Sequence, residues 1–438
     1  MSSMHPVRRR QRGAIAIVVG LMLVVLVGFV GLALDGGRLY LTKTELQNAA
    51  DACALAASYE LTDAPSIPPE AFARADAAGR MVAQRDRVNF QQAPIASGDV
   101  SIGFSTSLGS GSGGWASAGA PPAGNARYVR CTITRDGISP WFMQVLGFGD
   151  QSVSALATAS LARAQTACAI PMALCATAGA PDFGYVPGDW YGVDFSDNGS
   201  SVTNYTGNFR WIDFDPSAPT PGCSGHGASE LACLLAGTGQ CSLPTPPTGG
   251  CTGSGSSGTT PGCVGETGNI TSMQSAYNAR FGLYRGGGGN PGLTDSPPDF
   301  TGYSYSTENW AAGRNAYPNF RSAQAAHLPA NNDPAVSPPF YSNPYRPSTT
   351  EEHATRGAER RVVVMPIVEC AGFASGQHAP IRAYACVLML DPYRKQGNDV
   401  KSRIEYLGRA DQPGSPCATS GIPGDAGSQG PMVPSLVQ

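Results

Sequence analysis

Charged residues are scarce in this chain. Asp, Glu, Lys and Arg together make up 14% of its 438 residues, whereas about 25% is usual in soluble domains. The 29 basic and 32 acidic side chains leave a net charge of -3, and no basic block follows residue 12. Proteins that bind nucleic acids neutralise rows of phosphates with clustered Lys and Arg. We therefore expect no nucleic-acid partner.

Familiar catalytic motifs are also missing. The chain has no G-x-S-x-G nucleophile elbow, no G-x-x-x-x-G-K-[ST] phosphate loop and no H-E-x-x-H zinc motif. Asp194, Ser196 and Asn198 imitate the start of a metal-dependent adhesion site, but no buried apolar strand precedes them, so we interpret them as an Asx-rich turn. Four histidines lie in loop-like sequence, where we expect solvent around them: His226, His327, His353 and His378. We predict no catalytic residue, no cofactor and no metal site.

Cysteine, by contrast, is abundant. The twelve cysteines are an even number and none has the C-x-x-C spacing of a zinc site, so disulfides formed in an oxidising compartment are the natural interpretation. Many lie among Gly, Pro, Ser and Thr residues that could not form a packed core unaided. Cys370 and Cys386 lie on two predicted neighbouring strands and could be bridged to each other, and the other pairings stay open. The disulfide candidates are Cys168, Cys175, Cys223, Cys233, Cys241, Cys251, Cys263, Cys370 and Cys386.

An uninterrupted apolar run extends from Gly13 through Val25 to Leu34. As a helix it measures about 33 Å, which matches the hydrocarbon core of a bilayer. Because basic residues flank the cytoplasmic side of such spans, the predicted topology is a cytoplasmic N-terminus with the bulk of the chain in the periplasm. A cleaved secretory signal is the rival interpretation, but its apolar region is usually about 7 to 15 residues long. The preceding basic residues are Arg8, Arg9, Arg10 and Arg12.

The helical pattern continues beyond the apolar run. Leu39, Leu46 and Cys53 fall seven residues apart, with alanines at the intervening turns, so one long helix is predicted to about Tyr59. Its exported part has a face of small residues that allows another element to approach closely. Two roles stay open for this face: packing on the protein's own globular part, or assembly with other helices.

The rest of the chain predicts two α+β units. Residues 35–165 combine the extended helix with a small α+β head: a second helix from Pro69, strands over residues 99–104, 126–136 and 151–164, and a short apolar helix within 137–149 that glycine closes. Residues 166–414 form a loop-rich, disulfide-containing, mostly β domain, because Gly and Pro are frequent there. Its clearest strands are 360–370 and 381–392, which we expect to pair, and 401–408. Before these units, residues 1–12 are a cytoplasmic basic stub and residues 13–34 are the membrane span. After them, we expect residues 415–438 to be a disordered tail.

Residues 10–60 contain a basic stub ending in R-G-A, an apolar span, a turn with the pattern D-x-G-R-x-Y, and a helix with the pattern E-L-Q-N-A-A-D-A. The motif residues of the turn and the helix are Asp35, Gly37, Arg38, Tyr40, Glu45, Leu46, Gln47, Asn48 and Asp51. Together these elements resemble the N-terminal region of TadG-like proteins, of the TadE/TadG family of the Flp (tight adherence) pilus system. Parts of 126–159, 207–216, 275–284 and 360–392 are similar to later parts of that family, so the resemblance implies that the small α+β head is pilin-like.

This resemblance implies a non-catalytic pilus-assembly protein in the bacterial inner membrane. Expected partners are other Flp/Tad assembly proteins or pseudopilins, the lipid bilayer and possible further copies of the chain. Prepilin cleavage after Gly13 would require Glu at position 18, where this chain has Val18, so that processing is not expected. The alternative from another functional class is a surface-displayed adhesin or binding module held by the same helix.

Overall fold

The computed structural model describes residues 12–61, 67–109, 114–122, 126–194, 209–214, 223, 227–252, 260–266, 273–285, 296–370, 378–396, 399–425 and 427–437. The chain divides into two compact units. Unit 1 comprises Met1–Ala162 and Val433–Gln438, and unit 2 comprises Arg163–Met432. Arg8, Arg9, Arg10, Ser196, Asn198 and His226 lie outside the described residues.

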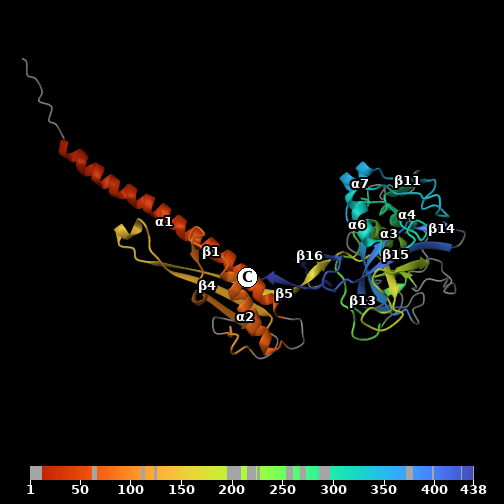
Figure 1. The fold of residues 1–438 in the computed structure, drawn as a ribbon, viewed down its shortest axis with the longest axis horizontal. Coiled ribbons are helices and arrows are strands. Elements are labelled where there is room, and N and C mark those ends of the chain that lie inside the picture. The colour runs from red at the N-terminus through yellow and green to blue at the C-terminus, as the bar shows by residue number, and fades with distance from the viewer. Residues whose placement is uncertain are drawn as a thin grey trace, which may run out of the picture. The chain divides into compact units, whose positions relative to one another are not determined.

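Helix α1 (Arg12–Tyr59) is continuous over 48 residues, which confirms the predicted long helix. Its two halves have opposite surroundings. Large apolar side chains between Ile15 and Leu34 are mostly exposed, whereas Leu46, Ala50 and Cys53 are completely buried. Figure 1 shows the first part of the helix extending alone before it joins the rest of unit 1. Most of the apolar half therefore lacks the protein neighbours that would keep it from water.

Unit 1 places a second helix and an antiparallel sheet against the buried half of α1. Helix α2 (Pro69–Ala83) begins with Pro at its first position, where the missing N–H is no loss. The main sheet of unit 1 has the order β5-β4-β3, and β17 (Met432–Leu436) also pairs with β5. The other elements are β1 (Arg87–Val88), β2 (Ala93–Pro94), η1 (Ser97–Asp99), β3 (Val100–Ser105), β4 (Tyr128–Ile138), η2 (Met143–Leu146) and β5 (Gln151–Thr166).

The small-residue face of α1 packs on the chain's own head. Ala49, Ala54 and Ala57 are fully buried in one apolar core with residues of α2, β3, β4 and β5. A Cβ on Gly79 of α2 would lie 3.2 Å from the carbonyl oxygen of Cys53, so glycine permits the close approach of the two helices. Of the two roles left open for this face, the structure shows the first: the face packs on the protein's own globular part.

A disulfide between Cys53 and Cys131 joins α1 to β4 across 78 residues of sequence. Both cysteines are fully buried. The sequence indicated Cys53 as a small residue of the helix face, and neither Cys53 nor Cys131 was among the predicted disulfide candidates. The bond fixes the long helix to the sheet of its own unit.

Unit 2 is built around a sheet whose strands close into a ring. From β12 the order is β6, β8, β9 and β13, and β13 pairs back onto β12; β15, β14 and β7 extend the sheet from β13. The strands are β6 (Met172–Cys175), β7 (Trp190–Asp194), β8 (Phe209–Asp213), β9 (Cys263–Glu266), β12 (Val362–Val368), β13 (His378–Met389), β14 (Arg394–Gln396) and β15 (Asp399–Arg409). The predicted pairing of 360–370 with 381–392 is confirmed, with Val364 opposite Cys386.

Both faces of β12 are buried. Met365 and Ile367 belong to one apolar core, and Val364 and Val368 belong to another. Short helices cover these faces, together with a two-stranded sheet. These elements are α3 (Ala228–Ala236), α4 (Gln274–Ala279), β10 (Leu283–Arg285), α6 (Tyr317–Ala325), β11 (Tyr345–Pro347) and α7 (Thr350–Arg356). The fold class is thus α+β with a β-rich second unit, as predicted.

Five disulfides cross-link unit 2, and they involve all the predicted cysteines. The suggested Cys370–Cys386 bridge is wrong: each of these residues has another partner because Cys386 lies opposite Val364 rather than Cys370. The pairs are Cys168–Cys241, Cys175–Cys370, Cys223–Cys233, Cys251–Cys263 and Cys386–Cys417.

The C-terminal segment is ordered, contrary to the prediction of a disordered tail over 415–438. It forms β16 (Ala418–Pro423) and β17 (Met432–Leu436). In unit 1 the backbone N–H of Val437 donates to the carbonyl of Thr158 at 2.8 Å. Low-complexity sequence hid this segment because its order comes from pairing with β5 and from the Cys386–Cys417 bond, not from local propensity.

Candidate functional site

Asp35 lies one residue beyond the apolar run and holds a distant loop against α1. Its carboxylate accepts backbone N–H bonds from Trp141 at 2.8 Å, Phe142 at 2.9 Å and Met143 at 2.8 Å. Burial disfavours the charged carboxylate, but these three donors and nearby Arg38 outweigh burial and lower the pKa of Asp35 below its usual value. Asp35, the first of the motif residues, therefore attaches the loop between β4 and β5 to α1.

Arg38, one turn further along α1, lies beside aromatic side chains near the loop that Asp35 holds. Its guanidinium lies 4.6 Å from the ring centre of Trp141 and donates to Asn89 Oδ1 and to the Ser139 carbonyl, both at 2.9 Å. The ring of Phe90 stacks on Trp141 with centres 6.4 Å apart. Trp141 is still 50% exposed and Phe90 49% exposed. A cation and an exposed aromatic pair thus lie at the end of the apolar span.

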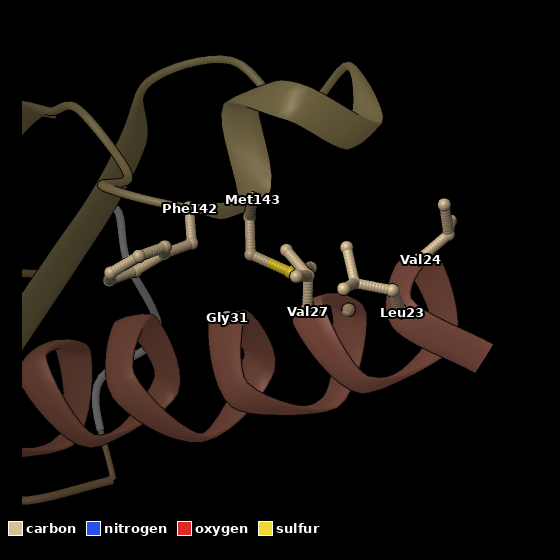
Figure 2. Close-up of a pocket in the computed structure, with 7 residues that line it drawn as sticks. Leu23, Val24, Val27, Gly31, Phe142 and Met143 are labelled. Carbon is tan, nitrogen blue, oxygen red and sulfur yellow. The ribbon is translucent and has the colours of Figure 1, made fainter. Parts of the chain in front are cut away.

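The loop between β4 and β5 continues down the apolar half of α1. Phe142 and Met143 face the helix, and Met143 points toward Val27 (Figure 2). Together with Leu23, Val24, Gly28 and Gly31 they line an apolar hollow of about 180 Å³, smaller than the roughly 300 to 1,000 Å³ of small-molecule sites. A Cβ on Gly31 would lie 2.9 Å from the Cβ of Phe142, so glycine is required for this approach.

The other motif residues fall into two groups. Leu46 is fully buried, Gln47 donates to Asp51 at 2.8 Å and to the Leu156 carbonyl at 2.9 Å, and Glu45 accepts from Gln91 at 3.3 Å. These residues hold the head on the helix. Three others are exposed: Gly37, Tyr40 and Asn48.

The predicted anchor residues lie in the exposed half of α1. Val25 is 58% exposed and Leu34 is 47% exposed, while Gly13 and Arg12 are in the first turn of the helix. This helix is long and apolar enough to cross a membrane. One long apolar helix at this end of the chain fits a single-pass anchor.

Buried charges in unit 2 serve the fold. The carboxylate of Asp299 accepts the backbone N–H groups of Arg360 at 2.8 Å and Arg361 at 2.9 Å, and the Arg361 guanidinium donates to the Met389 carbonyl. Burial raises the pKa of Asp299 and lowers that of Arg361. These bonds tie the segment around residue 300 to strands β12 and β13.

His353 does not lie in a solvated loop as predicted. It belongs to α7, is fully buried, and its Nδ1 lies 2.7 Å from the Asp299 carbonyl oxygen. The Thr349 side chain caps the N-terminus of α7, the helix that contains His353. This helix start was not predicted from the sequence. His327 and His378 are half-buried. Within the described ranges, no cluster of three or more His, Cys, Asp or Glu side chains could hold a metal ion.

The sequence predicted the motif helix but not the loop that packs against it. Residues 137–149 were predicted as a short helix closed by glycine, and η2 is followed by Gly147, which has φ 85°. The signal for a further role was present: an apolar, aromatic turn between two strands of a small sheet. Its contact with α1 spans more than 100 residues of sequence, which no local pattern reveals.

Comparison with known proteins agrees with the resemblance found in the sequence. Residues 13–65 match the family described as "Putative Flp pilus-assembly TadE/G-like". No curated protein and no solved structure matches the chain. The matched range contains the apolar half of α1, Asp35 and Arg38, which hold the loop between β4 and β5, and the buried alanine face. Over residues 13–65 this chain is therefore similar to the TadE/G-like family of Flp pilus-assembly proteins.

Proposed function

We propose that this protein is a non-catalytic, membrane-anchored component of Flp pilus assembly. Its N-terminus lies in the cytoplasm, α1 crosses the bacterial inner membrane once, and the rest of unit 1 and all of unit 2 are periplasmic. The family match supports involvement in Flp pilus assembly. The observation that carries the anchor is the contrast along one unbroken helix, whose first half exposes apolar side chains while its second half is buried in the head.

The attachment of the head supports a mechanical role for α1. Asp35 and the Cys53–Cys131 disulfide hold the helix at two places along its length. A rigid connection of this kind carries the position of the membrane helix to the periplasmic head. The disulfides of unit 2 agree with an oxidising periplasm.

Contacts with other assembly proteins need a surface that the head leaves uncovered. Gly37, Tyr40, Thr44 and Asn48 are exposed and are spaced by three or four residues, so they share one face of α1. Tyr40 is 76% exposed. This stripe is our proposed contact with a helix of another pilus protein, of a pseudopilin or of a second copy.

The anchor is tested by placing a charge in the apolar span. Val25→Arg should cost about 2.5 to 3.5 kcal/mol at the bilayer centre, so we expect loss of the protein from washed membranes and loss of pili. Val25→Leu is the matched control and should retain both. Normal piliation by a Val25→Arg protein recovered in the soluble fraction would contradict the proposal. Normal fibres with lost surface attachment in a deletion strain would favour the adhesin alternative.

The stripe is tested by photocrosslinking in cells. A photoreactive amino acid at Tyr40 should capture a pilus-assembly protein or a second copy. The control position is Met81 on α2, which is 53% exposed and lies off the stripe. Equal capture at both positions, or capture at Met81 alone, would contradict this contact surface.

A further inference from the structure

We propose that the loop between β4 and β5, residues 139–149, inserts into the outer leaflet of the membrane beside α1. The inference rests on the proposed membrane anchor and adds a second, non-spanning membrane contact to it. Phe142 and Met143 pack on α1 along Leu23–Gly31, well inside the apolar run that ends at Leu34 (Figure 2).

The length of the apolar run requires this placement. A bilayer core about 30 Å thick takes roughly 20 helical residues, and Gly13–Leu34 supplies little more than that. If the membrane ended at Leu23 so that the loop stayed in water, the remaining span would measure only about 16 Å at 1.5 Å per residue. Moving the span toward the N-terminus would bring Arg8, Arg9 and Arg10 into the hydrocarbon. The loop therefore shares the depth of the outer half of the span.

The chemistry of the loop suits that depth. Between Ser139 and Gly149 there is no charged residue. Trp141 is 50% exposed and Phe148 is 52% exposed. Gly31, where Phe142 packs, and Val27, toward which Met143 points, lie about 4.5 Å and about 10.5 Å below Leu34 along the helix. These two depths bracket the roughly 5 to 10 Å of burial that is typical of an interfacial element. Trp at this level is typical of the aromatic belts of membrane proteins.

Five backbone N–H groups in the loop already have partners, which favours insertion because hydrocarbon offers none. Asp35 accepts the N–H groups of Trp141, Phe142 and Met143. At the other end of η2, Gly147 N–H donates to Gln144 at 3.0 Å and Phe148 N–H donates to Met143 at 3.2 Å. Arg38 lies over Trp141, where its guanidinium can reach lipid phosphates.

The occupant is lipid rather than another protein helix because the contact surface continues the lipid-facing surface of α1. The apolar hollow beside Phe142 and Met143 is lined by Leu23, Val24 and Val27, all side chains of the span itself. A surface continuous with the span at the same depth meets the same surroundings.

The test uses Trp fluorescence of the full-length protein in vesicles whose lipids carry bromine either near the headgroup or near the chain end. Trp141→Phe reports the contribution of Trp141. The matched control is Trp115→Phe: Trp115 lies over Arg130, near the opposite end of β4 and about 27 Å along the strand from the loop. Vesicle flotation is measured in parallel.

We expect flotation with quenching by headgroup-proximal bromine that is lost in Trp141→Phe and retained in Trp115→Phe. A water-soluble quencher should reach Trp141 less well in vesicles than its exposure in the protein predicts. Flotation with no quenching that depends on Trp141 would overturn loop insertion and leave the anchor standing, and shielding from the soluble quencher in that case would indicate a protein cover. Failure to float would overturn the anchor and the insertion together.

Discussion

At the scale of single residues, Asp35 joins two parts of unit 1 that are more than 100 residues apart. One carboxylate accepts three consecutive backbone N–H groups, an arrangement that charge makes stronger than neutral hydrogen bonds. Asp35 lies one residue beyond the apolar run, so this contact is at the end of the proposed membrane span. The side chain's identity is therefore tied to the loop and not to helix formation.

Asp35→Asn should release the loop. The neutral amide is a weaker acceptor, so we expect faster hydrogen exchange at the amides of Trp141, Phe142 and Met143, measured by mass spectrometry on the purified protein. Asp51→Asn is the control, because Asp51 accepts from Gln47 on its own helix. Unchanged exchange in the loop of Asp35→Asn would show that the apolar contacts alone hold it.

His353 should make unit 2 sensitive to acid. Burial lowers its pKa below the usual value, against the opposing effect of its bond to the Asp299 carbonyl. The folded state therefore binds the proton less readily than the unfolded state, whose pKa is about 6.5. The stabilising contribution is complete above that pKa and is lost as the pH falls through the lower, folded value. Urea unfolding between pH 7 and pH 5 should show a decline that His353→Gln reduces. The same decline in both proteins would assign the effect to other groups.

At the scale of elements, α1 combines two chemistries in one helix. Its first half is apolar all round, while its second half buries only the face with Leu46, Ala50 and Cys53. Continuity across the junction comes from helix propensity, and the attachment of the second half comes from packing and one disulfide. The helix could form without the head, but its orientation on the head depends on contacts distant in sequence.

Removing the Cys53–Cys131 bond should loosen the helix from the head. Chain-entropy reasoning gives about 4 kcal/mol for a loop of this size, with the usual dependence on the model. Cys53→Ala/Cys131→Ala should lower the denaturant midpoint of unit 1, measured in detergent, and increase proteolysis between α1 and α2. Cys223→Ala/Cys233→Ala is the comparison, since that bond closes 10 residues in unit 2. A midpoint for unit 1 equal to that of the parent protein would contradict a stabilising role.

At the scale of the whole molecule, the chain returns to its first unit at its end. Unit 1 contains Val433–Gln438, and β17 pairs with β5. The C-terminal strand covers hydrogen-bonding groups of β5 that would otherwise form an open sheet edge. Unit 1 thus includes a strand that follows unit 2 in the sequence.

Deletion of residues 432–438 should destabilise unit 1, although unit 2 separates these residues from the rest of unit 1 in the sequence. We expect the melting temperature of unit 1 to fall by roughly 2 to 4 °C for each kcal/mol lost. Calorimetry in detergent measures this change. Leu436→Ser is the control: Leu436 is 42% exposed and the substitution keeps the backbone pairing. An unchanged melting temperature after the deletion would show that β17 contributes nothing to unit 1.

The sequence by itself determined the features that depend on neighbouring residues. The apolar run and the alanine-rich continuation specify α1 because each residue's environment follows from helical spacing. Strands β3, β4, β5, β12, β13 and β15 were readable for the same reason, and the motif residues pointed to the family over the helix.

Only the tertiary structure decided how these pieces join. Cys53 meets Cys131, Asp35 meets the loop at Trp141, the tail pairs with β5, and His353 enters the core of unit 2. Each of these contacts links residues far apart in sequence or depends on a cap within loop-like sequence. Such contacts are selected by the free energy of burying apolar surface and satisfying polar groups over the whole chain, and local patterns do not carry that information.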